Sequence, residues 1–87
     1  MVGLKFSSQS DKFLSKCNEK LFIRISKKLE DLKLNPVPSD AKFIVRNNQG
    51  DKSFRIRVGK IRTLYEIKET ERLIIISKID KRERVYD

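Results

Sequence analysis

The chain has 87 residues, with 21 lysines and arginines against 12 aspartates and glutamates, and its formal net charge is +9. A chain of this length forms one small domain, here residues 1–87, and buries only about 60–65% of the surface that its unfolded form exposes. It has no histidine and one cysteine, which excludes a disulfide framework and a cysteine-based metal site and argues against a zinc or non-haem iron centre. We therefore expect no metal and no cofactor.

The hydropathy of the chain argues against a membrane protein. Its longest uninterrupted apolar run, Leu73–Ile76, is far shorter than the roughly 20 residues that a membrane span needs. No signal-peptide pattern is present either. We expect a soluble, cytoplasmic protein.

The first part of the chain predicts one strand followed by two helices. Val2, Leu4 and Phe6 alternate with small or polar residues, as in a short strand. Serines at positions 7, 8 and 10 are candidate N-caps for a helix over residues 8–16, with Cys17 on its apolar stripe. A second helix over residues 18–33 has apolar residues at helical spacing, namely Leu21, Phe22, Ile25, Leu29 and Leu32. The basic face of this helix could contact RNA, although an ordinary solvated face is the simpler interpretation.

The second part of the chain predicts four strands. The first covers residues 42–46, and a cluster of turn residues follows at 47–51. A hairpin and a polar turn at 68–72 come next. Leu73–Ile76 is then a continuous apolar run rich in β-branched isoleucine, which we expect to be a central strand buried on both faces and ending at Ile79. The expected order is β-α-α-β-β-β-β, an α+β fold in which two N-terminal helices pack on one face of a small antiparallel sheet.

The hairpin lies in the stretch SFRIRVGKIRTLYEI at residues 53–67. Apolar and basic residues alternate before the Gly59-Lys60 pair, and a second extended run follows it. Two turn residues with glycine first fit a tight turn of the II′ kind. Such a turn pairs Arg57 with Arg62 and places Arg55 on the same face of the sheet.

Three arginines on one sheet face need an explanation, because like charges directly opposite each other destabilise a sheet by roughly 0.2–1 kcal/mol. Glu66 lies diagonally from Arg55 in this register and offsets part of the repulsion. Planar guanidinium groups suit a phosphate ligand. An ordinary salt-screened, solvated strand face explains the same pattern equally well.

The positive charge is concentrated around this hairpin. Residues 42–62 contain seven lysines and arginines against one aspartate, a net charge of +6. A focused excess of this kind points to a polyanionic partner, either nucleic acid or an acidic protein segment.

These residues also resemble a known family. The run FRIRVGKIRTLYEI, the Ile-rich strand after it and the closing DKRERVY are together similar to the RelE family of bacterial and archaeal toxins, within the RelE/ParE superfamily, and we expect an archaeal member. The two helices before the hairpin and the proline-containing loop after them match the family layout. The resemblance covers nearly the whole chain.

The resemblance implies a small cytoplasmic toxin of a type II toxin–antitoxin system. Such a toxin is neutralised by a RelB-like antitoxin and, when free, cleaves mRNA in the ribosomal A site, next to 16S rRNA. The antitoxin could cover the basic face or displace the C-terminal tail. No membrane partner is implied.

The family's catalytic residues can be carried over by position. Its two strand cations fall on Arg55 and Arg57, where well-studied members have lysines, and the arginine after the turn falls on Arg62. The arginine after the last strand falls on Arg82 and the terminal tyrosine on Tyr86. Further cations nearby are expected to bind RNA, namely Lys52, Lys60, Lys81 and Arg84.

RNA can be cut without a metal when its own 2′-hydroxyl attacks the adjacent phosphorus. The arginines would stabilise the charge that develops on the phosphate. Tyr86, with an ordinary pKa near ~10, could act as the base if neighbouring cations lower that pKa, or it could stack on a base of the message. Packing of Tyr86 against the sheet edge is the alternative without a function. Arg82 could neutralise the leaving group.

Two other functions fit the same sequence. One is a ParE-like toxin of the same fold that inhibits DNA gyrase, which does not need the arginine and tyrosine set. The other is a non-enzymatic RNA-binding or ribosome-associated protein, which the charge of +9 allows equally.

Overall fold

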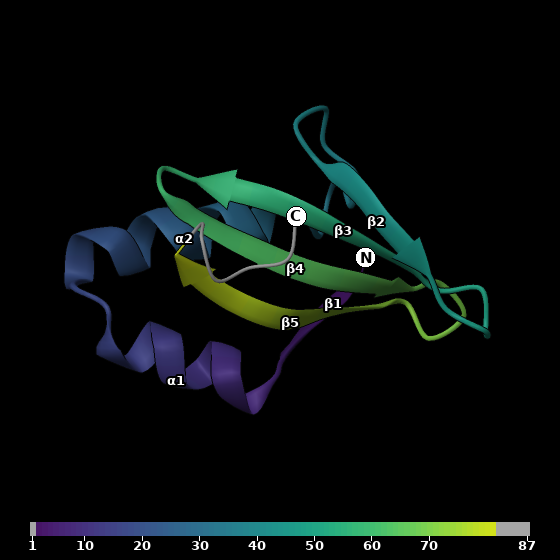
Figure 1. The fold of residues 1–87 in the computed structure, drawn as a ribbon, viewed down its shortest axis with the longest axis horizontal. Helices are drawn as coiled ribbons and strands as arrows, with labels where there is room; N and C mark the ends of the chain where they lie inside the picture. The colour runs from purple at the N-terminus through teal and green to yellow at the C-terminus, as the bar shows by residue number, and fades with distance from the viewer. Residues whose placement is uncertain (1, 82–87) are drawn as a thin grey trace.

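A computed structural model describes residues 2–81 of the chain (Figure 1). Its elements follow the predicted order of strand, two helices and four strands. Their bounds are β1 (Gly3–Phe6), α1 (Ser8–Lys16), α2 (Glu19–Asp31), β2 (Lys42–Arg46), β3 (Lys52–Val58), β4 (Ile61–Lys68) and β5 (Leu73–Lys81). Among these residues, neither helix is long and apolar enough to cross a membrane.

The five strands form one sheet in the order β1-β5-β4-β3-β2. The consecutive strands β2 to β5 pair antiparallel, whereas β1 pairs parallel to β5. The α+β class is confirmed, but the expectation of a wholly antiparallel sheet was wrong for β1. The reason is that the chain leaves β1 through both helices and reaches β5 last, so no tight turn fixes their relative direction.

Both helices begin at the side chains that the sequence suggests. The Oγ of Ser7 accepts a hydrogen bond from the backbone nitrogen of Ser10 at 3.1 Å, and the Oδ1 of Asn18 accepts one from that of Leu21 at 2.8 Å. These caps satisfy backbone donors that the first helical turn leaves without partners. Cys17 follows α1 and is half-buried.

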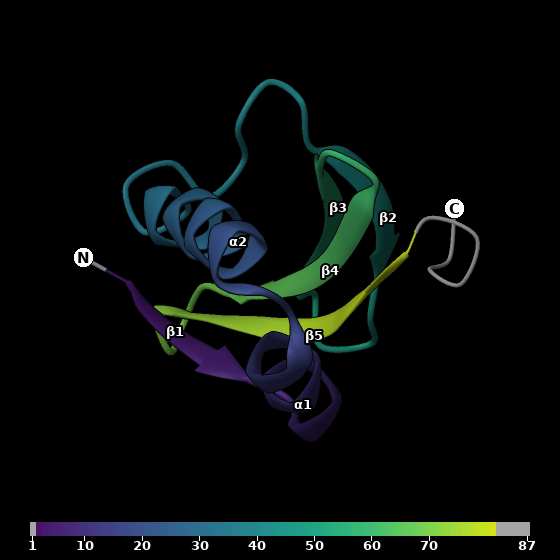
Figure 2. The ribbon, with the colours of Figure 1, turned by 90° about the vertical axis from the view of Figure 1, so that its left-hand side faces the viewer.

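Helix α1 lies along the edge of β5 rather than over the centre of the sheet (Figure 2). Strand β1 ends opposite Ile76, and side chains of α1 continue the hydrogen bonding beyond it. Ser10 Oγ donates to the carbonyl of Ile76 at 3.0 Å. The amide of Gln9 both donates to the carbonyl of Ile79 and accepts from its backbone nitrogen, at 2.7 and 2.9 Å. Helix α1 thereby covers an edge that would otherwise expose unpaired backbone groups.

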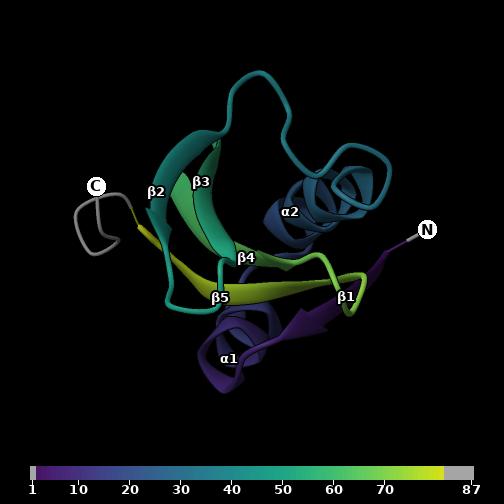
Figure 3. The ribbon, with the colours of Figure 1, turned by 90° about the vertical axis from the view of Figure 1, so that its right-hand side faces the viewer.

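Helix α2 lies over one face of the sheet (Figure 3) and contributes the buried side chains of Ile25 and Leu29 to the core. Its apolar stripe is buried against one face of the sheet, and the core consists of Ile25, Leu29, Leu32, Phe54, Ile56, Val58, Ile61, Tyr65, Ile74, Ile76 and Ile79. Strand β5 is an interior strand, as predicted, with Ile74 and Ile76 fully buried and Leu73 and Ile75 half-buried. It extends to Lys81, two residues beyond the predicted end.

Candidate nucleic-acid interface

The β3–β4 hairpin has the predicted register. Val58 pairs with Ile61, and Arg57 pairs with Arg62. Gly59 has a φ of 60°. Among the described residues other than glycine, Arg72 alone has a positive φ, so the φ of Lys60 is negative. This matches a II′ turn, which requires positive φ at its first central residue alone.

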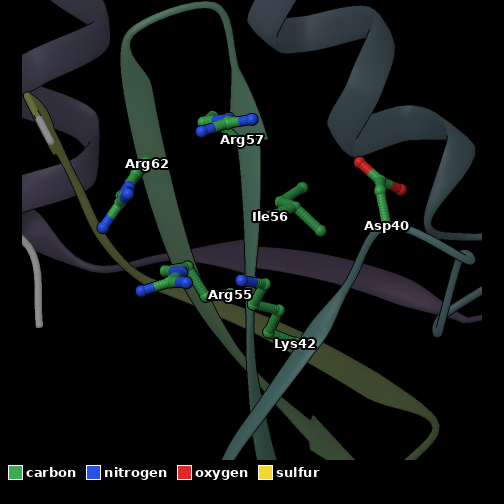
Figure 4. Close-up of a pocket in the computed structure, with 6 residues that line it drawn as sticks. All are labelled: Asp40, Lys42, Arg55, Ile56, Arg57 and Arg62. Atoms are coloured by element: carbon green, nitrogen blue, oxygen red, sulfur yellow. The ribbon is translucent and has the colours of Figure 1, made fainter. Parts of the chain in front are cut away.

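The hairpin places three guanidinium groups around one hollow of about 240 Å³ (Figure 4). We call this hollow the arginine groove, and its lining residues are Asp40, Lys42, Arg55, Ile56, Arg57 and Arg62. Strand β2 begins at Lys42, opposite Arg55, so β2 does not cover the outer edge of β3 beyond that point. The groove forms there, between the start of β2 and the hairpin turn.

The four cations of the groove differ in exposure. Arg57 and Lys42 are exposed, while Arg55 and Arg62 are half-buried. Cross-strand neighbours in an antiparallel pair lie about 4.5–5.5 Å apart at Cβ, so the side chains of Arg57 and Arg62 leave the backbone close together. Guanidinium groups that line the same hollow suit a phosphate, which accepts several hydrogen bonds.

Asp40 adds a carboxylate that the sequence did not single out. Its Oδ2 accepts a hydrogen bond from Lys28 Nζ of α2 at 2.8 Å. This bond holds the pKa of the Asp40 carboxyl below its usual value of 3.8, so the group is negative at neutral pH. Figure 4 shows Asp40 on the opposite side of Ile56 from Arg62, so the negative charge of the groove lies away from Arg62.

Glu66 has partners at the far end of the hairpin. It accepts a hydrogen bond from Asn47 Nδ2 at 3.0 Å and lies 3.7 Å from Lys68 Nζ. Lys68 is also hydrogen-bonded to Asp51 at 3.0 Å. This bond lowers the pKa of Asp51 and raises that of Lys68. This polar cluster closes the turn between β2 and β3.

The other predicted RNA-binding cations lie outside the groove. Lys52 lines a separate hollow with Arg46 and Phe54. Lys60 is exposed in the hairpin turn, and Lys81 lines a cavity beside α1. Three further predicted residues, Arg82, Arg84 and Tyr86, lie outside the described residues. The structure therefore brings together Arg55, Arg57 and Arg62, and it adds Lys42 and Asp40.

Within residues 2–81, no group of three or more histidine, cysteine, aspartate or glutamate side chains is arranged to hold a metal ion. The groove offers cationic side chains, and the chemistry that it supports is the binding and charge stabilisation of an anion.

Comparison with known proteins agrees with the fold. No family model matches the chain. The chain is 41% identical, over 58 residues, to the protein named "Putative toxin RelE1" of Methanocaldococcus jannaschii. The matched segment spans 67% of this chain and 64% of that protein. In sequence, the chain is therefore similar to a RelE protein.

Solved structures of RelE proteins have the same fold. The RelE–RelB complex of Pyrococcus horikoshii contains a chain that superposes with a TM-score of 0.83 and 23% identity, covering 97% of this chain and 98% of that one. The isolated RelE toxin of Escherichia coli superposes with a TM-score of 0.73 and 19% identity, covering 98% of this chain and 88% of that one. At these identities the likeness shows the RelE fold.

Proposed function

We propose that this chain belongs to the RelE family, is the toxin of a type II toxin–antitoxin system and cleaves mRNA in the ribosomal A site. The observation that carries the proposal is the arginine groove, in which Arg55, Arg57 and Arg62 share one small hollow. Sequence similarity to a protein named as a toxin supports the same role. Arginines placed directly opposite each other lower the stability of a sheet, and a polyanionic ligand would offset that repulsion.

The groove suits a reaction in which the RNA supplies its own nucleophile. The 2′-oxygen forms a bond to phosphorus as the bond from phosphorus to the 5′-oxygen breaks, which leaves a cyclic phosphate and a 5′-hydroxyl. One proton leaves the 2′-hydroxyl and one joins the 5′-oxygen. Arg55, Arg57 and Arg62 stabilise the negative charge that builds up on the phosphate oxygens, which is usually the largest contribution to such catalysis.

Proton transfer is assigned by the family resemblance to Tyr86 as base and Arg82 at the leaving group. The chain has no histidine, and the low pKa of Asp40 makes that carboxylate a weak base. A site with weak acid–base groups depends on the positioning of its substrate, which can lower the barrier by several kcal/mol. The ribosome, with 16S rRNA around the A site, would hold the message in place.

The proposed partners follow from this role. A RelB-like antitoxin would hold the toxin inactive in the cytoplasm, and solved relatives are complexes of RelE with RelB from Pyrococcus horikoshii and Methanococcus jannaschii. Co-purification of an acidic protein from the native source, together with growth arrest on expression of the toxin alone, would support this partner.

The direct test is primer extension on an mRNA translated in vitro with purified ribosomes. We expect new 5′ ends at A-site codons and a loss of about 10²-fold in cleavage rate for Arg57→Ala, the size typical for removal of one charge-stabilising donor. Lys20→Ala, which removes one exposed positive charge on α2, is the matched control and should cleave normally.

The stability of Arg57→Ala separates lost chemistry from lost folding. Removal of one of two opposed arginines should leave the free energy of unfolding unchanged or raise it by roughly 0.2–1 kcal/mol. Intact mRNA with blocked DNA supercoiling would instead indicate a ParE-like gyrase inhibitor. Binding to ribosomes without cleavage or growth arrest would indicate a non-enzymatic protein, and either result would refute the proposal.

A further inference from the structure

A second hollow lies at the end of the sheet away from the arginine groove. Its volume is about 280 Å³, and we call it the distal hollow. The turn from β2 to β3 and the turn from β4 to β5 both lie at this end of the sheet, opposite the turn of the β3–β4 hairpin (Figure 1). The residues that line the distal hollow include Val37, Arg46, Lys52, Phe54, Ile67 and Glu69.

The distal hollow is separate from the arginine groove, with which it shares no lining residue. Arg55 and Arg57 of β3 line the groove. Lys52 and Phe54 of the same strand line the distal hollow. Successive side chains of a strand point to opposite faces of the sheet, so these two pairs lie on different faces. A ligand in the distal hollow therefore needs none of the arginines of the groove.

Two cations of the distal hollow lie directly opposite each other. Arg46 of β2 and Lys52 of β3 are register partners, and both line the hollow. Among the described residues, neither side chain has a hydrogen-bond or ion-pair partner. Like charges directly opposite each other destabilise a sheet. A doubly charged anion bound between the two side chains would remove this repulsion.

The rest of the lining combines apolar surface with one carboxylate. Phe54 is buried, Ile67 is half-buried and Val37 is 49% exposed, so these three side chains offer an apolar wall to a flat ring. Glu69 is exposed in the turn after β4. A carboxylate accepts hydrogen bonds and donates none. A ligand that matches the whole lining carries a double negative charge, a ring and N–H donors at the edge of that ring.

A nucleotide meets all of these requirements, and other small anions meet fewer of them. Inorganic phosphate leaves the apolar wall without a contact. A phosphorylated tyrosine brings a ring, but that ring has no donor for the carboxylate. The volume of about 280 Å³ is near the lower end of the roughly 300–1,000 Å³ of small-molecule pockets, which limits the ligand to about one nucleotide.

We propose that the distal hollow binds one guanosine 5′-phosphate, either as a free nucleotide or at the 5′ end of an RNA. Arg46 and Lys52 hold the phosphate, and the base lies against Val37 and Phe54. Guanine presents two neighbouring donors, N1–H and the 2-amino group, which match the two oxygens of the Glu69 carboxylate. Uracil has one N–H between two carbonyls, and adenine and cytosine have one amino group beside an acceptor nitrogen. This binding goes beyond the nuclease proposal, because it requires no cleavage.

The probe is guanosine 5′-monophosphate, titrated against the full chain and followed by amide NMR shifts. We expect the shifts to centre on residues 46–54 and 67–69, which border the distal hollow. Guanosine lacks the phosphate and ribose 5-phosphate lacks the base, so each should bind at least about tenfold more weakly. Inosine 5′-monophosphate is the matched control for the base. It lacks only the 2-amino group and should bind about tenfold more weakly.

Variants assign the binding to the side chains of the hollow. Arg46→Ala and Lys52→Ala should each weaken binding of guanosine 5′-monophosphate at least about tenfold, because each removes a charged phosphate contact. Lys20→Ala removes the same charge from an exposed position on α2 and should bind normally. Glu69→Ala should still bind the nucleotide, since it removes a negative charge, but it should bind the guanosine and inosine nucleotides equally.

A 5′-phosphorylated guanosine-uridine dinucleotide distinguishes the two sources of the ligand. Binding as tight as that of the mononucleotide assigns the distal hollow to the 5′ end of an RNA, whereas loss of binding assigns it to a free nucleotide. No shift around the hollow at millimolar guanosine 5′-monophosphate would overturn the proposal. Equal binding of ribose 5-phosphate, equal binding of the inosine nucleotide to the unaltered chain, or equal losses for Lys52→Ala and Lys20→Ala would also overturn it. None of these measurements involves cleavage, so they leave the nuclease proposal to its own test.

Discussion

At the scale of single residues, the arginine groove contains four cations and one carboxylate with a defined partner. The Lys28–Asp40 ion pair ties the segment before β2 to α2, and it sets the border of the groove on that side. An exposed ion pair of this kind contributes little to stability, about 0–1 kcal/mol. Its effect is on the electrostatics of the groove, where it would favour an anion on the side of Arg55 and Arg62.

Tyr65 is the buried ionisable residue whose loss should be visible in a pH series. Its side chain is fully buried, and its hydroxyl donates to the carbonyl of Pro36 at 2.6 Å. Burial, together with the charge of Asp40, raises the pKa of Tyr65 above its usual value of 10.0. Tyr65→Phe should lower the free energy of unfolding by about 1–2 kcal/mol at neutral pH, because the carbonyl loses its donor.

This difference should shrink at alkaline pH. Above pH 10.0 the unfolded chain loses the phenolic proton while the folded chain keeps it, so the stability of the wild type falls with rising pH, by up to ~1.4 kcal/mol per pH unit. Urea unfolding of both proteins between neutral pH and pH ~11 measures the difference in their free energies of unfolding. The lysines titrate in both proteins, so their effect cancels in this difference. A difference that stays constant over this range would contradict the assignment.

At the scale of elements, the hairpin turn determines where the arginines lie. Gly59 has a φ of 60°, and a Cβ added there would lie 3.4 Å from Arg24 Nη2. Gly59→Ala should destabilise the protein by about 1–2 kcal/mol, mostly from backbone strain, because the arginine side chain can move. Gly3→Ala is the control, since its Cβ would make an ordinary 3.7 Å contact with Leu73. Denaturant unfolding that gave equal losses for both variants would exclude turn strain as the cause.

The hairpin could be predicted because its information is local. A glycine followed by one residue between two alternating runs fixes the register, and the register fixes the position of Arg57 opposite Arg62. The pairing of β1 with β5 depends on contacts between distant segments, such as the hydrogen bonds from Gln9 to Ile79, 70 residues apart. Asp40 joins the groove through Lys28 of another element. No pattern in the neighbouring sequence indicates either contact.

At the scale of the whole molecule, the layers separate the apolar contacts from the charge. Helix α2 covers one face of the sheet, α1 covers the edge of β5, and the groove opens on the side of β3 that no helix covers in the described chain (Figures 2 and 3). The cations that we propose bind a polyanion are therefore concentrated on one part of the surface. The net charge of +9 acts at longer range and speeds encounter with any polyanion.

The salt dependence of RNA binding distinguishes the local site from the general charge. Four groove cations that each neutralise one phosphate of a single-stranded RNA predict that log K falls with log salt concentration with a slope of about −3, near −0.7 per contact. Arg57→Ala should make this slope less steep by about 0.7, because it removes one contact. Fluorescence anisotropy with a labelled oligouridine measures the slope. Lys20→Ala removes the same charge from α2 and should leave the slope unchanged, since its side chain lies outside the groove. Equal changes for the two variants would mean that the net charge of the chain, rather than the arginine groove, binds the RNA.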